Sequence, residues 1–295
     1  MHLFVRVAER GSFSAVAQQL GLARSVVTRQ IAALEAHLGV KLMARSTRQL
    51  TLTSAGSAYL EKCRVILNLV DTAEADVGEA RQTPRGLLRI SLPLSFGLVR
   101  LAPWLLDFAQ RYPDVSLDMD YSDRQVNLIE EGLDLSIRVT RRLQAGDVAR
   151  KIGVARMHVV AAPDYLARHG RPQSPADLAD HECLGYTAGG PMLNWPFMAE
   201  TVTVRSRLHA NNGEVLTEAA AQGLGLTLQP DFIIEPFLAS GRVCIVLADF
   251  PVPELGIYAL LPSNRHIPHR VRVLMDFLAE RLAGAGDMTG AALNP

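Results

Sequence analysis

The sequence has few cysteines, no long apolar run and no excess of charge of either sign. Its three cysteines, Cys63, Cys183 and Cys244, are far apart and form no C-x-x-C pair. This argues against a disulfide framework and against a zinc knuckle, so we expect three reduced thiols. No stretch could span a bilayer, and the opening MHLFVRVAERGSF does not read as a secretion signal, so the expected compartment is the cytoplasm.

Motifs of catalysis and of metal binding are also missing. The sequence contains no P-loop, no G-x-S-x-G and no H-E-x-x-H. Asp118, Asp120 and Asp123 lack the glycine and the glutamate of a calcium loop at the required spacing. A proline stands between His266 and His269 and disrupts their presentation on a helix. We therefore predict that the chain is not an enzyme and that it binds no metal and no cofactor.

What the chain does have is apolar bulk and an uneven distribution of charge. With 295 residues, of which 48% are hydrophobic, it is long enough for two or three domains with substantial cores. Residues 1–60 hold seven basic groups against two acidic ones, whereas the rest of the chain holds 23 basic and 28 acidic groups. A basic head on a mildly acidic body indicates that a polyanion is the partner of the head alone.

Apolar spacing predicts three short helices in the head. The first ends at Gly11, and the second begins after a serine cap at Ser12 or Ser14 and runs to about Leu20. Gly21 can turn with positive φ, and the third helix then covers the segment GLARSVVTRQIAALE. Its core stripe lies at i, i+4, i+7 and i+11 and consists of Val27, Ile31, Leu34 and Leu38.

Basic and hydroxyl side chains lie outside that stripe, near the start of the third helix. Because arginine reads guanine edges and hydroxyls hold phosphates, we predict that this helix enters a major groove. The candidate DNA contacts on it are Arg24, Ser25, Val26, Thr28 and Arg29. Two predicted strands, 40–43 and 50–53, frame a basic wing whose candidate contacts are Arg45, Thr47 and Arg48. The alternative is a three-helix core whose arginines only solvate its outer face.

The run GSFSAVAQQLGLARSVVTRQIAALEAHLGVKLMARSTRQLTLTSAG resembles the winged helix-turn-helix of LysR-type transcriptional regulators over more than forty residues. The resemblance implies a DNA-binding regulator. The family usually has serine, glutamine, serine and phenylalanine where this chain has Ala23, Arg24, Thr28 and Met43. The alanine leaves the third helix without its usual cap, and Arg24 is expected to alter the base preference.

A long helix is predicted after the wing, from about Ala55 to Arg81, with Thr53 as its cap. Its apolar residues recur at alternating spacings of three and four residues and so form one seam along the helix, which Glu74 interrupts. The seam consists of Leu60, Cys63, Leu67, Val70 and Val77. We predict a dimerisation helix, as the resemblance also implies; the alternative is an ordinary helix packed on its own domain. Residues 82–86 break the helix and form a linker.

From Leu87 onward, strands alternate with helices, which indicates α/β layers. The segments FAQRYPDVSL, EEGLDLSIRV and AAAQGLGLTLQP are similar to parts of the LysR-type effector domain. The resemblance implies a multi-domain chain: an all-α winged helix-turn-helix head with a long linker helix, then an α/β effector domain of two subdomains that resembles periplasmic binding proteins. The predicted division is 1–57 for the head, 58–86 for the linker and dimerisation helix, and 87–295 for the effector domain. The predicted parts of that domain are 87–161 with 263–283 (subdomain I), 162–262 (subdomain II) and 284–295 (flexible tail), with crossings near Ala161 and Pro262.

In such a cleft, a ligand meets strand ends and helix N-termini, where free N–H groups favour anions. Ser95, between the first strand and its helix, is the leading contact. Arg138 ends an apolar strand, where it either pairs internally with a carboxylate or contacts the ligand. Asn211 and Asn212 either cap the following helix or face the cleft. The full set of candidate effector contacts is Pro93, Ser95, Phe96, Arg138, Asn211, Asn212 and Thr227.

Together these patterns predict a sequence-specific transcriptional regulator whose activity is modulated by a small-molecule effector, with an anion as one candidate class. Its predicted partners are an operator in double-stranded DNA, the effector and further copies of the chain, as a homodimer assembled into the homotetramer that the resemblance implies. No membrane partner is expected. The alternative is a soluble small-molecule binding protein without a DNA role, which leaves the basic head without a purpose.

Overall fold

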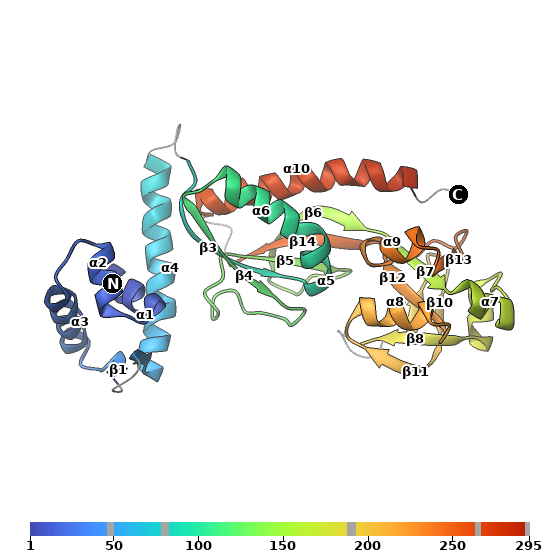
Figure 1. Cartoon of the computed structure of the whole chain (residues 1–295), viewed down its shortest axis with the longest axis horizontal. Coiled ribbons are helices and arrows are strands. Elements are labelled where there is room, and N and C mark those ends of the chain that lie inside the picture. The colour runs from blue at the N-terminus through green and yellow to red at the C-terminus, as the bar shows by residue number, and fades with distance from the viewer. Residues whose placement is uncertain (46–49, 78–82, 188–192, 263–266, 293–295) are drawn as a thin grey trace. The chain divides into compact units, whose positions relative to one another are not determined.

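The computed structural model describes residues 1–45, 50–77, 83–187, 193–262 and 267–292 (Figure 1). Its contacts divide the chain into two compact units. The N-terminal unit consists mainly of Met1–Thr83, and the C-terminal unit of Pro84–Val126, Asp134–Pro262 and Arg270–Pro295. Each unit is described by itself below. No helix among the described residues is long and apolar enough to cross a membrane.

The N-terminal unit contains the predicted helices and a two-stranded wing base. Its elements are α1 (His2–Arg10), α2 (Phe13–Gln19), α3 (Arg24–Leu38), β1 (Met43–Arg45), β2 (Leu50–Leu52) and α4 (Ser54–Val77). The Oγ atom of Ser12 accepts a hydrogen bond from the Ala15 N–H at 3.2 Å, and Gly21 turns the chain with φ of 64°. Thr53 Oγ1 accepts from the Gly56 N–H at 2.9 Å. The serine cap at Ser12, the glycine turn and the Thr53 cap are thereby confirmed.

The core of this unit lies between α1, α2, α3 and the first turns of α4, and it corrects one predicted core position. Val27 and Ile31 are buried as expected, and Leu34 is half-buried. Leu38 is 37% exposed, whereas Glu35 is only 7% exposed. The reason is geometric: position 35 follows Val27 and Ile31 at steps of four, and it meets the chain where α3 gives way to the wing.

The predicted dimer seam of α4 is also corrected. Leu60 and Cys63 are buried in the core of their own unit, and Leu67 packs half-buried against it. The neighbouring Tyr59 ring packs 5.4 Å from the ring of Phe4. Because the head covers this side of α4, these residues have little surface left for a partner. The apolar surface that α4 leaves exposed consists of Val65, Ile66 and Val70, at 42%, 42% and 41% exposure, while the Val77 side chain lies outside the described residues.

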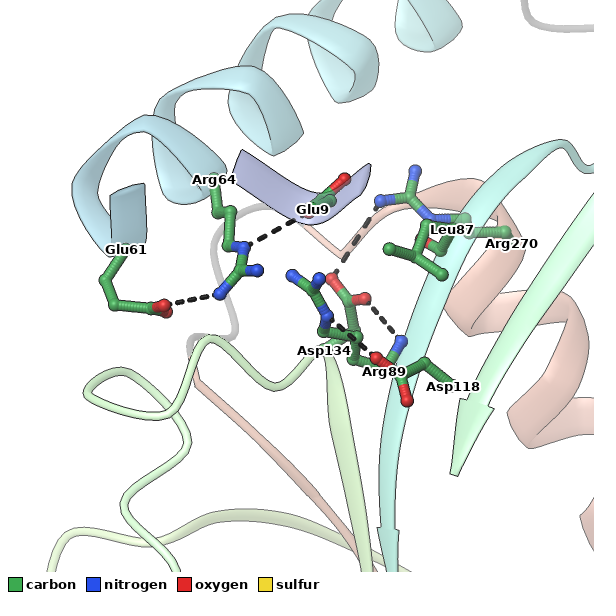
Figure 2. Close-up of polar contacts among 8 residues, drawn as sticks. All are labelled: Glu9, Glu61, Arg64, Leu87, Arg89, Asp118, Asp134 and Arg270. Atoms are coloured by element: carbon green, nitrogen blue, oxygen red, sulfur yellow. Dashed lines mark hydrogen bonds and ion pairs between the residues drawn. The ribbon is translucent and has the colours of Figure 1, made fainter. Parts of the chain in front are cut away.

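Arg64 joins α4 to α1 within the N-terminal unit (Figure 2). Its Nε donates to the Glu9 carboxylate at 3.3 Å, and its Nη1 donates to Glu61 one turn earlier on α4. All three side chains are partly buried. The guanidinium therefore holds the head against the helix that follows it.

The C-terminal unit contains two sheets, and the first sheet has the order β4-β3-β5-β14-β6. Its strands are β3 (Gly86–Leu92), β4 (Val115–Tyr121), β5 (Leu135–Thr140), β6 (Val148–Ala155) and β14 (Leu255–Leu261). Strand β3 is parallel to both β4 and β5, whereas β14 is antiparallel to β5 and β6. The helices next to this sheet are α5 (Leu94–Phe96), a π-helical turn (Gly97–Leu101), α6 (Ala102–Arg111) and α10 (His269–Ala292) (Figure 1).

The second sheet has the order β11-β8-β12-β7-β13. Its strands are β7 (Met157–Ala161), β8 (Glu182–Tyr186), β11 (Arg205–Ala210), β12 (Leu226–Pro230) and β13 (Cys244–Val246), and a hairpin of β9 (Asn194–Pro196) and β10 (Thr201–Thr203) lies beside them. Its helices are α7 (Pro163–His169), α8 (Gly213–Ala221), α9 (Asp231–Ala239) and a 3-10 turn (Pro175–Asp180). The predicted architecture of two α/β subdomains is confirmed.

The crossings between the two sheets differ from the prediction. The chain leaves the first sheet at Arg156, between β6 and β7, and returns between Val246 and Leu255. The predicted points near Ala161 and Pro262 are wrong because β7 pairs with β12 and β13, and β14 pairs with β5 and β6. The predicted tail, 284–295, overlaps the end of α10, which runs on to Ala292.

A buried charge cluster fixes the start of β5 in the first sheet (Figure 2). Asp134 accepts from the Arg89 N–H at 2.9 Å and lies 3.9 Å from Arg270, with both charged side chains less than a tenth exposed. The Arg270 Nε also donates to the Leu87 carbonyl at 2.8 Å. Arg89 lies 3.2 Å from Asp118, so this carboxylate belongs to an ion pair on the sheet face. The cluster ties β3, β5 and α10 together and thereby fixes where β5 begins.

Candidate DNA interface and effector site

The start of α3 presents exposed polar side chains beside a core that faces the other way. Arg24, Ser25 and Arg29 are exposed, Val26 and Thr28 are half-buried, and Val27 is fully buried. Ala23 precedes the helix without a side-chain hydrogen bond, as its residue type predicts. The first N–H groups of an uncapped helix carry partial positive charge, which adds to the charge of the arginines. This end of α3 is chemically suited to phosphate and to base edges.

The wing base is attached to α3 through Glu35, a residue that the sequence analysis did not single out. Its carboxylate accepts hydrogen bonds from the N–H groups of Leu42 at 3.0 Å and Met43 at 3.1 Å, and from the Lys41 ammonium at 2.7 Å. Burial raises the pKa of Glu35, but these three bonds outweigh it, and the pKa lies below its ordinary value. The signal that could have identified Glu35 is its place in the spacing of Val27 and Ile31.

The other side of the same wing segment is attached to α4. Thr53 Oγ1 donates to the Lys41 carbonyl at 2.7 Å, and the Thr53 N–H donates to the Leu42 carbonyl at 3.0 Å. A Cβ on Gly56 would lie 1.9 Å from that Leu42 oxygen, so only glycine fits there. Arg45 is placed in β1, but its side chain, like Thr47 and Arg48, lies outside the described residues. The base of the wing is thus held between α3 and α4.

The predicted effector contacts around α5 are positioned by the end of β3. Pro93 is buried and precedes α5, and Ser95 and Phe96 are buried within it. Phe96 packs edge-on against Phe232 of α9, with ring centroids 5.0 Å apart. The Ser95 hydroxyl donates to the Glu214 carboxylate of α8. These contacts bring the first turn after β3 against helices of the second sheet.

The hydrogen-bond donors at the start of α5 already have carboxylate acceptors from the chain itself. The Leu94 N–H donates to Asp123 at 3.0 Å, and Ser95 donates to Glu214. The half-buried phenol of Tyr186 has its pKa raised to about 12, first by burial and then by the charges of Asp123 and Glu214. This corner is acidic, which differs from the expectation that α5 offers free N–H groups to an anion.

Arg138 makes internal contacts at the end of β5. Its guanidinium donates to Ser91 Oγ at 2.9 Å, to the Ile137 carbonyl at 2.8 Å and to the Arg124 carbonyl at 3.2 Å. Those three acceptors are neutral. They orient the guanidinium across the face of the sheet.

The other predicted effector residues lie in the second sheet and its helix. Asn212 caps α8, since its Oδ1 accepts from the Val215 N–H at 3.0 Å, and Asn211 is exposed. Thr227 is fully buried in β12, where its hydroxyl accepts from Gln229 at 2.9 Å. A pocket of about 680 Å³ lies along β7 and the segment 245–254, and none of the predicted effector residues lines it.

Arg141, one residue past the end of β5, is a further candidate that the sequence analysis missed. Its Nε and Nη2 are inaccessible and have no hydrogen-bond partner among the described residues. Burial alone lowers the pKa of its guanidinium. In the sequence it is one of several arginines near Arg138, and no local pattern marks it. The described residues contain no group of three or more His, Cys, Asp or Glu side chains that could hold a metal ion.

Models of known families match both parts of the chain. A model described as a bacterial regulatory helix-turn-helix protein of the lysR family matches residues 1–57. A model described as a LysR substrate binding domain matches residues 81–283, which is more than half of the chain.

Individual relatives agree with the family models. The HTH-type transcriptional regulator CrgA of Neisseria meningitidis is 35% identical over 284 residues, which cover 95% of each chain. The solved structure of CrgA aligns with a TM-score of 0.61, covering 95% of this chain and 97% of that one at 35% identity. The full-length structure of the Vibrio cholerae virulence activator AphB aligns with a TM-score of 0.57 at 30% identity, covering 95% and 97%.

These relatives are transcriptional regulators and not enzymes, in agreement with the prediction from the missing catalytic motifs. The helix-turn-helix head and the unit with two sheets each match the corresponding family model. The alternative of a binding protein without a DNA role is therefore not favoured. The chain belongs to the LysR family of transcriptional regulators, with a DNA-binding helix-turn-helix head and an effector-binding regulatory domain.

Proposed function

We propose that this regulator reads its operator with the first turns of α3 in a major groove. The observation that carries the proposal is the exposed, basic start of α3 opposite a buried stripe. Arg24 and Arg29 are the candidate readers of base edges, and Ser25 and Thr28 the candidate phosphate contacts, with Val26 beside them. The wing residues Arg45, Thr47 and Arg48 are proposed to contact the neighbouring backbone or minor groove.

The experiment that tests this proposal is selection of genomic fragments by the purified full chain, followed by sequencing of what it retains. A partly palindromic site is expected, because two recognition helices of a symmetric dimer meet two half-sites. The amount of DNA that the protein retains should fall steeply as the salt concentration rises, because protein contacts with DNA phosphates release counterions. If no fragment is enriched even at low salt, the proposal fails.

We expect Arg29→Ala to weaken operator binding by about 1–3 kcal/mol if the side chain makes a bidentate contact with a base. The measurement is a binding isotherm on the selected operator and on variants of each half-site. Arg10→Ala is the matched control, because it removes the same charge from an exposed position on α1, outside α3. Equal affinity and equal sequence preference for Arg29→Ala and the unmodified chain would exclude Arg29 from the interface.

We also propose that the chain acts as a dimer formed through α4, with the exposed Val65, Ile66 and Val70 as the contact in place of Leu60 and Cys63. A second exposed apolar stripe supports further assembly into a tetramer: Leu98 and Leu106 lie two turns apart next to the first sheet, at 55% and 59% exposure. Apolar side chains exposed on one helix face mark interaction surfaces. The proposed functional division remains 1–57, 58–86 and 87–295.

We propose that the effector binds at the carboxyl edge of the first sheet. There β3, β4 and β5 run parallel, the ends of β3 and β4 lead to Ser95 and Asp123, and Arg138 lies within β5, two residues before its end. Ligands of open α/β sheets bind outside the carboxyl ends of the strands. Pro93 and Phe96 shape this edge, while Asn211, Asn212 and Thr227 belong to the second sheet and its helix α8.

We expect Ser95→Ala to bind the operator normally and to respond more weakly to the effector. The substitution removes the hydroxyl that joins α5 to Glu214 on α8. The elements of the two sheets thereby lose one of the contacts through which binding of the effector at the first sheet is transmitted to the second. The test compares retention of the selected operator with and without small acids that the flanking gene products act on. A variant that responds as fully as the unmodified chain would refute the assignment.

A further inference from the structure

Arg141 differs from the other buried or half-buried arginines of the C-terminal unit. Arg270 and Arg89 are bonded to carboxylates, and Arg138 donates to three oxygen atoms. The Nε and Nη2 of Arg141 are buried without an acceptor among the described side chains and backbone groups. A buried guanidinium is costly unless an acceptor satisfies it. Arg141 is the residue that follows the last residue of β5 in the first sheet. The fold tolerates its two unsatisfied donors at that position.

The two atoms without acceptors among the described residues, Nε and Nη2, are a pair with which an arginine side chain binds an oxyanion. Nε and Nη2 point their N–H groups in the same direction, along one side of the planar guanidinium. Two parallel N–H groups match the two oxygens of a carboxylate, or two oxygens of a phosphate or sulfate. The orphaned donors of Arg141 therefore have the shape of an oxyanion receptor and not of a general surface charge.

Arg141 follows one of the three parallel strands of the proposed effector site. In the order β4-β3-β5, neighbouring strands lie about 4.8 Å apart; β3 and β4 end level with each other, at Leu92 and Tyr121, whereas β5 runs three residues beyond that level, to Thr140. Their ends lead to Asp123, Ser95 and Arg141 respectively. The donors at Leu94 and Ser95 are satisfied by Asp123 and Glu214, whereas the Nε and Nη2 of Arg141 have no acceptor in the part of the chain that the structure describes. An anionic group arriving at this edge finds its open donors at β5 and not at α5.

We propose that Arg141 binds an oxyanion group of the effector, a carboxylate or a phosphate, through its Nε and Nη2. The proposal rests on the effector site proposed above and names the chemical class that the site takes. Since both atoms are inaccessible in this structure, the anion reaches them only after the covering side chains shift. Binding is then coupled to a rearrangement at the edge of the first sheet, which is what a ligand-responsive regulator requires.

The first test needs no ligand. Arg141→Met keeps a long side chain and removes the half-buried charge with its two inaccessible donors, so in chloride buffer we expect it to raise the unfolding temperature by about 2–4 °C. Both tryptophans, Trp104 and Trp195, lie in the C-terminal unit, so their fluorescence in the full chain reports its unfolding. Arg142→Met is the matched control: it removes the same charge from the next residue, which is exposed.

The second test adds anions as probes. Sodium sulfate and sodium benzoate, each compared with sodium chloride at equal ionic strength, should raise the unfolding temperature of the unmodified chain and of Arg142→Met more than that of Arg141→Met. Neutral benzamide should not distinguish the three proteins. Arg141→Lys keeps the charge without the planar pair of donors, so its apparent affinity for either anion should be at least about tenfold weaker.

Two outcomes overturn the proposal. If Arg141→Met unfolds at a lower temperature than the unmodified chain in chloride, the guanidinium has a structural role in the fold. If sulfate and benzoate stabilise Arg141→Met as much as the unmodified chain, the anion binds elsewhere or only through general salt effects. Neither measurement involves DNA, so failure of the proposed operator binding is recognised separately, by the fragment selection and the Arg29→Ala isotherm.

Discussion

Replacing Glu35 by alanine is expected to destabilise the head by about 2–4 kcal/mol and to abolish most of its operator binding. The carboxylate accepts two buried backbone N–H groups, at 3.0 and 3.1 Å, where α3 passes into the wing. Alanine leaves both donors without their acceptor and detaches the wing from α3. Hydrogen exchange of the Leu42 and Met43 amides in the full chain measures the local stability, and an operator isotherm measures the function. Slow exchange of both amides in the alanine variant would contradict the expectation.

The charge of Glu35 gives this prediction a pH dependence with a definite sign. Because the folded-state pKa lies below the unfolded value of about 4.3, the charged carboxylate stabilises the head above that pH and loses its contribution as the pH falls through the folded value. Glu35→Gln keeps the size of the side chain but loses the charge. Its stability deficit should therefore be full at pH 7 and shrink below about pH 4. Thr28→Ser, a half-buried change on the same helix, is the control and should show no such trend.

Replacing Ile66 by glutamate is expected to halve the mass of the assembly in solution and to weaken operator binding by about a hundredfold or more. Ile66 lies between Val65 and Val70 on the exposed side of α4, so the substitution places a charge at the centre of the proposed contact. A single head meets one half-site, and the gain from simultaneous engagement of two half-sites is lost. Sedimentation at micromolar concentration and an operator isotherm are the two measurements.

The control for Ile66→Glu is Val154→Glu. Val154 is exposed to a similar degree, 44%, but lies on β6 of the C-terminal unit, so it adds the same charge to an apolar position outside α4. It should leave the operator affinity unchanged. An Ile66→Glu variant that keeps both the mass and the affinity of the unmodified chain would show that α4 forms no dimer contact on this side.

Local sequence was enough to predict the elements of the head. Ser12 and Thr53 cap their helices through their own hydroxyls, and Gly21 turns the chain because it lacks a Cβ. These are interactions within a few residues, and a residue type with a strong local preference suffices to identify them. Strand β4 carries a similar local signal, because its alternating side chains reflect one exposed and one packed face.

Periodicity was less successful where two surfaces compete for the same helix. The seam of α4 was predicted as one stripe, yet Leu60 and Cys63 are buried by the head while Ile66 stays exposed. Spacing shows that side chains share a face, but not which partner covers that face. The burial of Glu35 was missed for a related reason, since its acceptor role depends on backbone N–H groups seven and eight residues later.

The sequence by itself determined the class of this protein: a basic helix-turn-helix head with a wing, a long helix, and α/β layers of the LysR kind. These features come from local preferences, from periodicity and from the distribution of charge along the chain. Only the tertiary structure decided where the chain crosses between the sheets, that Arg138 is bonded internally, and that the Nε and Nη2 of Arg141 have no acceptor among the described residues. The reason is physical: whether a buried charge has an acceptor depends on groups that distant strands and helices bring together, and no local pattern records them.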